Sequence, residues 1–115
     1  MRESIIKDKS YAFALRIIVL AQWLRGRKEY ELASQILRAG TGIGSNVEEA
    51  LAGVSRADFT AKMAVASKEA RETHYWLRLL RDSKTVPAER ITSLSDECLE
   101  LVRMLTAIVK TGQGK

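Results

Sequence analysis

The chain has 115 residues, of which 46% are hydrophobic and 29% are charged, and its formal net charge is +5 at pH 7. This length provides one domain, because it cannot bury two independent cores. The single Cys98 excludes an internal disulfide, and one cysteine with one histidine excludes a Cys/His zinc site.

The first predicted helix covers residues 10–25 and follows residues 1–9, which are mostly polar and are expected to fray. Its buried seam repeats at helical spacing and consists of Phe13, Ile17, Leu20 and Leu24. Its other sides carry four further apolar residues, Leu15, Ile18, Val19 and Trp23. A helix that is apolar nearly all round is buried on more than one side, so this pattern predicts self-association of so small a domain.

The same apolar run is interrupted by Arg16 and Gln22 and is too short to span a bilayer. We recognise no signal peptide before it. We therefore expect a cytoplasmic protein that has no membrane partner.

The second predicted helix covers residues 29–52, with a seam of Leu32, Ile36, Ala39, Ile43, Val47 and Ala50. Its middle, AGTGIGSN, contains Gly40, Gly42 and Gly44 and superficially resembles a phosphate-binding loop. Such a loop needs a preceding strand and a Gly-Lys-Ser/Thr sequence, and neither is present. We expect the glycines to allow close approach of another helix and to favour a kink or short break.

The third predicted helix covers residues 56–82 and opens with a capping box from Ser55 to Asp58. Its seam consists of Phe59, Met63, Ala66, Ala70, Thr73, Leu77 and Leu80. A second face is apolar except for two carboxylates and consists of Val65, Glu69, Glu72, Trp76 and Leu79. A lone amphipathic helix needs only the first face, so the second face predicts a further packing surface.

The fourth predicted helix covers residues 87–110, because Pro87 suits a first helical turn and residues 111–115 are expected to be disordered. Its seam consists of Ile91, Leu94, Cys98, Leu101, Leu105 and Ile108. Four helices with short connections and no alternating strand pattern predict an all-α antiparallel up-down four-helix bundle.

Four polar residues stand on or beside apolar helix faces: Asn46, Glu49, Glu69 and Glu72. A buried carboxylate needs a cationic or hydroxyl partner, for which Arg16, Arg38 and Arg71 are candidates. One hypothesis is a buried polar network that fixes helix register, and the alternative is a set of solvated residues at the edge of the helices.

Basic residues form the candidate nucleic-acid-binding surface, which consists of Arg25, Lys28, Lys68, Arg71, Tyr75, Arg78 and Arg81. Cations would grip phosphates and Tyr75 would stack on a base. Arg27 belongs to the same cluster as Arg25 and Lys28, at the connection between the first two helices. The alternative is a solvated face that is balanced by neighbours such as Asp82.

No catalytic or metal-binding pattern is recognisable, and we expect neither an enzyme nor a cofactor. A di-metal bundle needs Glu-x-x-His on two helices, whereas Arg71 stands three residues before His74, the only histidine. No nucleophile and acid can be assigned to this histidine as members of a hydrolytic triad.

Two segments, GIGSNVEEA at 42–50 and DFTAKMAVASKEARETHYWLRLL at 58–80, resemble the bacterial four-helix bundle proteins encoded in intervening sequences of large-subunit ribosomal RNA genes. Ile43, Asn46 and Glu49 match the family's Ser-Ile-x-x-Asn-Ile-Ala-Glu-Gly pattern, whereas Gly42, Glu48 and Ala50 depart from it. The chain is also similar to the accessory variability proteins of diversity-generating retroelements. The resemblance implies a homopentameric barrel, and the accessory proteins imply binding of nucleic acid and of a reverse transcriptase.

These observations predict a non-enzymatic homo-oligomeric scaffold that binds RNA or DNA through a basic surface. The alternative is a protein-interaction module whose basic face meets an acidic partner, such as a reverse transcriptase, without binding nucleic acid. The salt dependence of binding separates the two, because nucleic-acid binding weakens steeply with salt.

Overall fold

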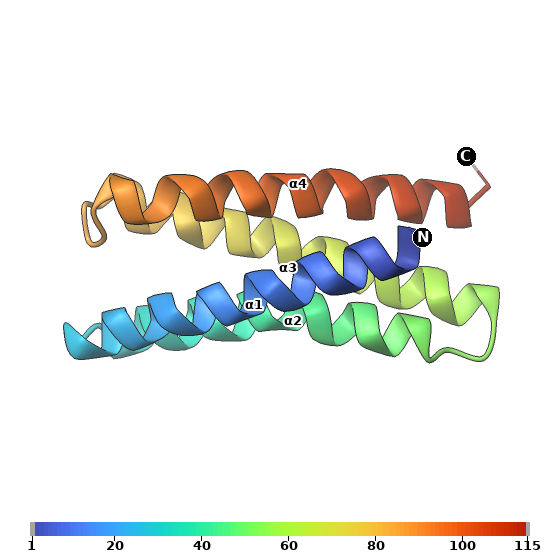
Figure 1. The fold of residues 1–115 in the computed structure, drawn as a ribbon, viewed down its shortest axis with the longest axis horizontal. Coiled ribbons are helices and arrows are strands. Elements are labelled where there is room, and N and C mark those ends of the chain that lie inside the picture. Colours follow the sequence, from blue (N-terminus) through green and yellow to red (C-terminus); the bar gives the residue numbers. More distant parts are fainter. Residues whose placement is uncertain (1, 115) are drawn as a thin grey trace.

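The computed structural model describes residues 2–114, and their side chains from Ile5 onward. It contains four helices, α1 (Arg2–Gly26), α2 (Tyr30–Leu51), α3 (Arg56–Asp82) and α4 (Ala88–Gly112), and no strand within residues 2–114. Consecutive helices run in opposite directions, so the α1–α2 and α3–α4 turns lie at one end of the molecule (Figure 1). The α2–α3 turn and both chain ends lie at the other end. The predicted all-α class with four helices is confirmed.

Helix α1 begins at Arg2, so the predicted fraying is wrong for residues 2–9. Ile6 and Ser10 are buried and extend the seam of this helix by two turns. Ile6 is the one apolar residue that faces the core among the described side chains of this stretch, since Ser10 is polar, which gave the sequence a polar appearance. Helix α4 continues to Gly112, so residues 111 and 112 are helical where we expected disorder.

The predicted seams of all four helices form one continuous hydrophobic core. Its largest fully buried side chains come from every helix and include Phe13, Ile36, Leu77 and Leu105. Leu32 and Phe59 lie at the edge of this core and are only partly buried. The chain therefore buries one face of each helix, as the spacing of its apolar residues requires.

The glycines of α2 lie inside one uninterrupted helix, so the expected break does not occur and these residues form no phosphate-binding loop. A Cβ atom on Gly40 would stand 2.7 Å from both γ carbons of Ile17, and one on Gly44 would stand 3.4 Å from the Ser10 carbonyl oxygen. Both contacts are with α1. The small residues therefore allow α1 to lie directly on α2, as predicted.

Helix α1 packs more extensively on α2 than on α4. Two ion pairs between exposed side chains connect α1 with α4, Lys9 with Glu100 at 3.1 Å and Arg16 with Glu97 at 2.6 Å. Two shallow hollows lie between the two helices, one lined by all four of these residues and the other by Arg16 alone of the four. The side of the bundle between α1 and α4 is thus its least tightly packed side.

None of the helices described here is long and apolar enough to cross a membrane.

Replacing Gly40 by alanine is expected to lower the free energy of unfolding by up to about 2 kcal/mol. The new methyl group would overlap Ile17, which is fully buried. Overpacking costs about 1–3 kcal/mol, and a gain of about 1 kcal/mol in helix propensity offsets part of it. Urea denaturation of the variant and the wild type measures the difference.

Gly26→Ala is the matched control, because a Cβ atom there meets nothing within 4 Å. This change should leave the free energy of unfolding unchanged or raise it by up to about 1 kcal/mol, because Gly26 is helical and alanine favours a helix. A Gly40→Ala variant as stable as the control would contradict the close contact between α1 and α2.

Candidate nucleic-acid interface

Seven basic residues gather at the end of the bundle that carries the α1–α2 and α3–α4 turns (Figure 1). We call this group the basic end, and it consists of Arg25, Arg27, Lys28, Arg78, Arg81, Lys84 and Arg90. The up-down course of the helices brings them together from two segments that are distant in sequence. Four of the seven, Arg25, Lys28, Arg78 and Arg81, belong to the predicted binding surface.

The two lysines of the basic end occupy backbone conformations that ordinarily favour glycine. Lys28 has φ of 67° and Lys84 has φ of 61°. Each follows the end of a helix, and the Lys28 amide donates to the Arg25 carbonyl oxygen at 2.9 Å. A left-handed conformation costs a residue with a side chain roughly 1–2 kcal/mol. Both turns therefore hold a cation where glycine would be less strained.

Most cations of the basic end have no carboxylate partner. Asp82 accepts a hydrogen bond of 2.8 Å from Nε of Arg81, which holds the pKa of this carboxyl below its ordinary value. Among the side chains of residues 5–114, the other six cations have no carboxylate oxygen within 4.0 Å, although Glu29 and Glu89 stand at the same end. The positive charge here is thus largely uncompensated by ion pairs.

Two arginines of the basic end contact the ring of Trp23. The guanidinium carbons of Arg27 and Arg90 lie 4.5 Å and 5.1 Å from the centroid of the Trp23 ring. Arg90 comes from α4, whereas Trp23 and the segment that follows it come from α1 and its turn. Arg27 was part of the predicted basic cluster, whereas Arg90 was not, because only the packing of α4 against α1 brings Arg90 to the ring.

The remaining predicted contacts lie along α3, away from the α1–α2 turn. Lys68, Arg71 and Tyr75 are all exposed. Arg71 donates a hydrogen bond of 2.8 Å to the Thr106 hydroxyl on α4, and Arg78 lies 5.8 Å from the centre of the Tyr75 ring. The predicted surface is therefore two regions, the basic end and a flank of α3, rather than one patch.

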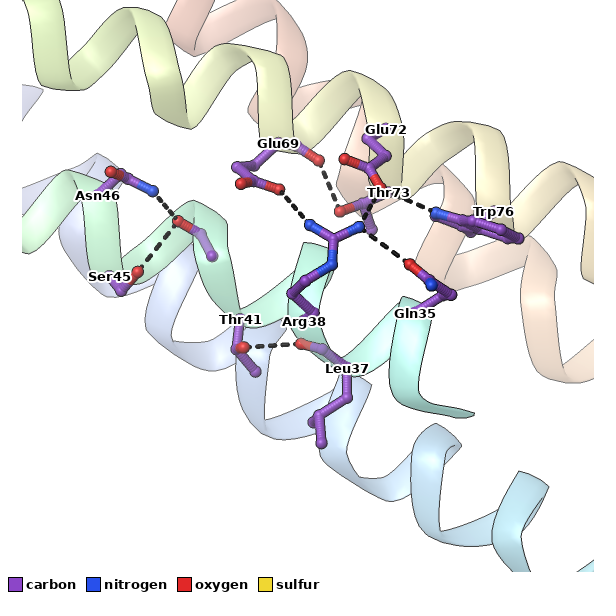
Figure 2. Close-up of polar contacts among 11 residues, drawn as sticks. Gln35, Leu37, Arg38, Thr41, Ser45, Asn46, Glu69, Glu72, Thr73 and Trp76 are labelled. Carbon is purple, nitrogen blue, oxygen red and sulfur yellow. Dashed lines mark hydrogen bonds and ion pairs between the residues drawn. The ribbon is translucent and has the colours of Figure 1, made fainter. Parts of the chain in front are cut away.

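Arg38 on α2 connects the two embedded acids of α3 (Figure 2). Its guanidinium donates to Oε2 of Glu72 and lies 3.6 Å from Oε1 of Glu69. Trp76 donates from Nε1 to the same Glu72 oxygen at 3.1 Å. These hydrogen bonds, from Arg38 first and then from Trp76, lower the pKa of Glu72. The cluster links the facing surfaces of α2 and α3.

The predicted buried network of four polar residues is wrong in two respects. Asn46 donates instead to the Gly42 carbonyl oxygen of its own helix at 2.8 Å, and Glu49 is exposed and pairs with Lys62 at 2.8 Å. The side chains of Glu69 and Glu72 are 23% and 38% exposed. These carboxylates lie at the edge of the α2–α3 contact, because the long Glu and Arg side chains reach outward from the core.

Of the three candidate partners, Arg38 alone meets these acids. Arg16 pairs with Glu97 on α4, and Arg71 bonds to a hydroxyl. Oε1 of Glu69 is shielded from solvent and has no hydrogen-bond partner, only the longer ion pair to Arg38.

The outward face of α1 is apolar although it is not part of the core. Four side chains on it are exposed by 38% to 62%: Tyr11, Leu15, Ile18 and Val19. We call these four residues the α1 stripe. They recur at i, i+4, i+7 and i+8, which places them on one side of the helix, opposite Phe13 and Leu24. A helix that faces only solvent ordinarily carries polar residues at such positions.

The described residues contain no group of three or more His, Cys, Asp or Glu side chains that could hold a metal ion. Cys98 is buried and donates from Sγ to the Ala70 carbonyl oxygen at 3.3 Å. Burial raises the pKa of its thiol to about 12, so the thiol is protonated at neutral pH. Burial, together with Arg78 and Arg81, lowers the pKa of His74, which is thus mainly neutral at pH 7.

Glu72→Gln keeps the side-chain size and removes the charge, and it should lower the free energy of unfolding at pH 7 by about 0.5–1 kcal/mol. The effect is small because the pair is partly exposed and screened. The folded-state pKa lies below the ordinary value of 4.5, so the charge stabilises above that pH and its contribution is lost as the pH falls through the lowered pKa. Denaturation at several pH values should show the two proteins converging in acid.

Glu48→Gln is the control for this prediction, because Glu48 is exposed on α2 and forms no ion pair with the side chains of residues 5–114. Its substitution should leave stability nearly unchanged at every pH. A difference between Glu72→Gln and the wild type that does not depend on pH would contradict the ion pair with Arg38.

Comparison with known proteins identifies relatives of this architecture. The family model described as 23S rRNA-intervening sequence protein matches residues 2–107. A similar solved structure is that of a protein with unknown function from the S23 ribosomal protein family of Bacteroides thetaiotaomicron. It is 42% identical, covers 96% of this chain and 99% of its own, and superposes with a TM-score of 0.91. No curated protein matches the chain.

Proposed function

We propose that this chain, which belongs to the family of 23S rRNA-intervening sequence proteins, is a non-enzymatic scaffold that self-associates and binds RNA or DNA through its basic end. The observation that carries this proposal is the gathering of six cations without carboxylate partners at one end of the bundle. Such a cluster favours a polyanion, because binding releases the counterions condensed on phosphates.

The strained lysines support the same assignment. Lys28 and Lys84 hold positive charge in a backbone conformation that glycine adopts more easily. Departures of local sequence from the least strained choice tend to occur at functional sites. Both departures in this chain lie at the basic end.

Self-association is supported by the α1 stripe. Four neighbouring apolar side chains on the outward face of a helix form a surface that association with another copy would remove from water. Closed symmetry would repeat the basic end around the assembly. Five copies, the number that the family resemblance implies, would carry about +25, which strengthens attraction to a polyanion beyond that of one chain.

We expect Arg25→Ala/Lys28→Ala/Arg78→Ala to weaken binding of short single-stranded RNA and DNA of several sequences by about tenfold or more. It should reduce the slope of log affinity against log salt by about 2, because three fewer phosphates are neutralised. Fluorescence anisotropy with labelled oligonucleotides at several salt concentrations measures both quantities.

The matched control is Arg56→Ala/Arg103→Ala/Lys110→Ala, which removes the same charge from exposed positions outside the basic end. Equal losses in the two variants would mean that net charge alone drives binding. Absence of binding by the wild type at low salt would contradict nucleic-acid binding and would favour the protein-interaction module with an acidic partner.

Light scattering at micromolar concentration should show a closed oligomer, which Leu15→Glu/Ile18→Glu dissociates. Two carboxylates within the α1 stripe would have to be buried without partners on association, which is costly. Ser93→Glu, at an exposed position of α4, should leave the mass unchanged. A wild-type monomer over the whole concentration range would contradict self-association.

A further inference from the structure

The contact of two guanidinium groups with one indole ring is a feature that the proposed function does not by itself require. Arg27 and Arg90 lie over Trp23, with their Cζ atoms 4.5 Å and 5.1 Å from the ring centroid. The two Cζ atoms cannot be farther apart than the sum of these distances. Two like charges are thus held within this limit of one another at the surface, where α1 meets α4.

Among the side chains of residues 5–114, no carboxylate oxygen lies within 4.0 Å of Arg27 or Arg90. Glu89 is adjacent in sequence to Arg90 and lines the same shallow hollow between α1 and α4, without forming an ion pair with it. An anion between the two guanidinium groups would relieve their mutual repulsion.

Contact with the Trp23 ring also restricts the two guanidinium groups before an anion binds. A guanidinium that lies on an aromatic face keeps its N–H groups at the edge of the plane, where they can donate two parallel hydrogen bonds. Cation–π contact restricts the side chain before the ligand arrives, so less conformational entropy is lost on binding. Lysine offers the same charge but not the planar fork.

We propose that Trp23, Arg27 and Arg90 form a clamp for a backbone phosphate of a bound nucleic-acid strand. The two guanidinium groups donate hydrogen bonds to the phosphate oxygens, and Trp23 holds both groups in place. This inference rests on the proposed function and adds the point within the basic end at which the strand is gripped. The other cations of the basic end then act on neighbouring phosphates through charge.

The test replaces both arginines while keeping the charge. Arg27→Lys/Arg90→Lys should weaken binding of a labelled single-stranded oligonucleotide by about tenfold, because the bidentate hydrogen bonds and the stacking are lost. The salt slope should stay nearly the same, since the number of neutralised phosphates is unchanged. Arg56→Lys/Arg103→Lys, at exposed positions elsewhere, should bind as the wild type does.

A second measurement reports on the clamp without changing it. In a Trp76→Phe background Trp23 is the only tryptophan, and its emission should change as the oligonucleotide saturates the protein. Inorganic phosphate in the millimolar range should not reproduce this change. Circular dichroism verifies that each variant keeps its helix content.

The outcomes separate the clamp from the proposed function. Wild-type binding that survives Arg27→Lys/Arg90→Lys unchanged, with constant Trp23 emission, would overturn the clamp and leave nucleic-acid binding elsewhere on the basic end. Saturation by inorganic phosphate alone would identify a small-anion site and overturn the strand clamp. Failure of the wild type to bind any oligonucleotide would overturn the proposed function itself, and the clamp with it.

Discussion

The close contact between α1 and α2 is the constraint on which the rest of the structure depends. Gly40 and Gly44 lack the side chains that would hold the helices apart, and Ile17 of α1 occupies the space that a Cβ atom on Gly40 would need. Helix α1 therefore packs closely against α2. Its contacts with α4 include two exposed ion pairs and the contact between Trp23 and Arg90. The same orientation turns the α1 stripe outward. The glycines therefore determine both the core and the exposed apolar face on which the proposed self-association rests.

The second constraint is the alignment of α2 with α3, which Arg38 supports from the surface. A guanidinium between Glu69 and Glu72 links the two helices at their middle, while the core fixes their separation. Because all four helices have similar lengths, their turns then fall at the same level. Cations near the two connections of α1–α2 and α3–α4 are brought together for that reason, although more than fifty residues separate Arg25 from Arg78.

The sequence predicted correctly those features that depend on residue spacing within a single helix. The seams were predicted from spacing, and the Ser55 side chain does accept a hydrogen bond of 3.0 Å from the Asp58 amide at the start of α3. The predictions that failed concern contacts between side chains of two different helices. Glu49 stood beside apolar residues of its helix just as Glu69 did, yet it pairs with Lys62 at the surface, and Arg90 gave no sign of its contact with Trp23. Periodicity gives the face on which a residue lies, but the reach of a long side chain past the edge of the core depends on the partner helix.

Two independent observations at the basic end, one electrostatic and one conformational, support the proposed binding of a polyanion. Unpaired cations are an electrostatic observation, because a surface with neighbouring carboxylates ordinarily forms some ion pairs. The positive φ of Lys28 and Lys84 is a conformational observation, because each turn could close with glycine at lower strain. Folding alone explains neither, since glycine at both turns would relax the backbone and reduce the repulsion between like charges. The proposed polyanionic ligand would account for both, because it needs charge at the tips of the turns, where the bundle ends and the backbone must reverse.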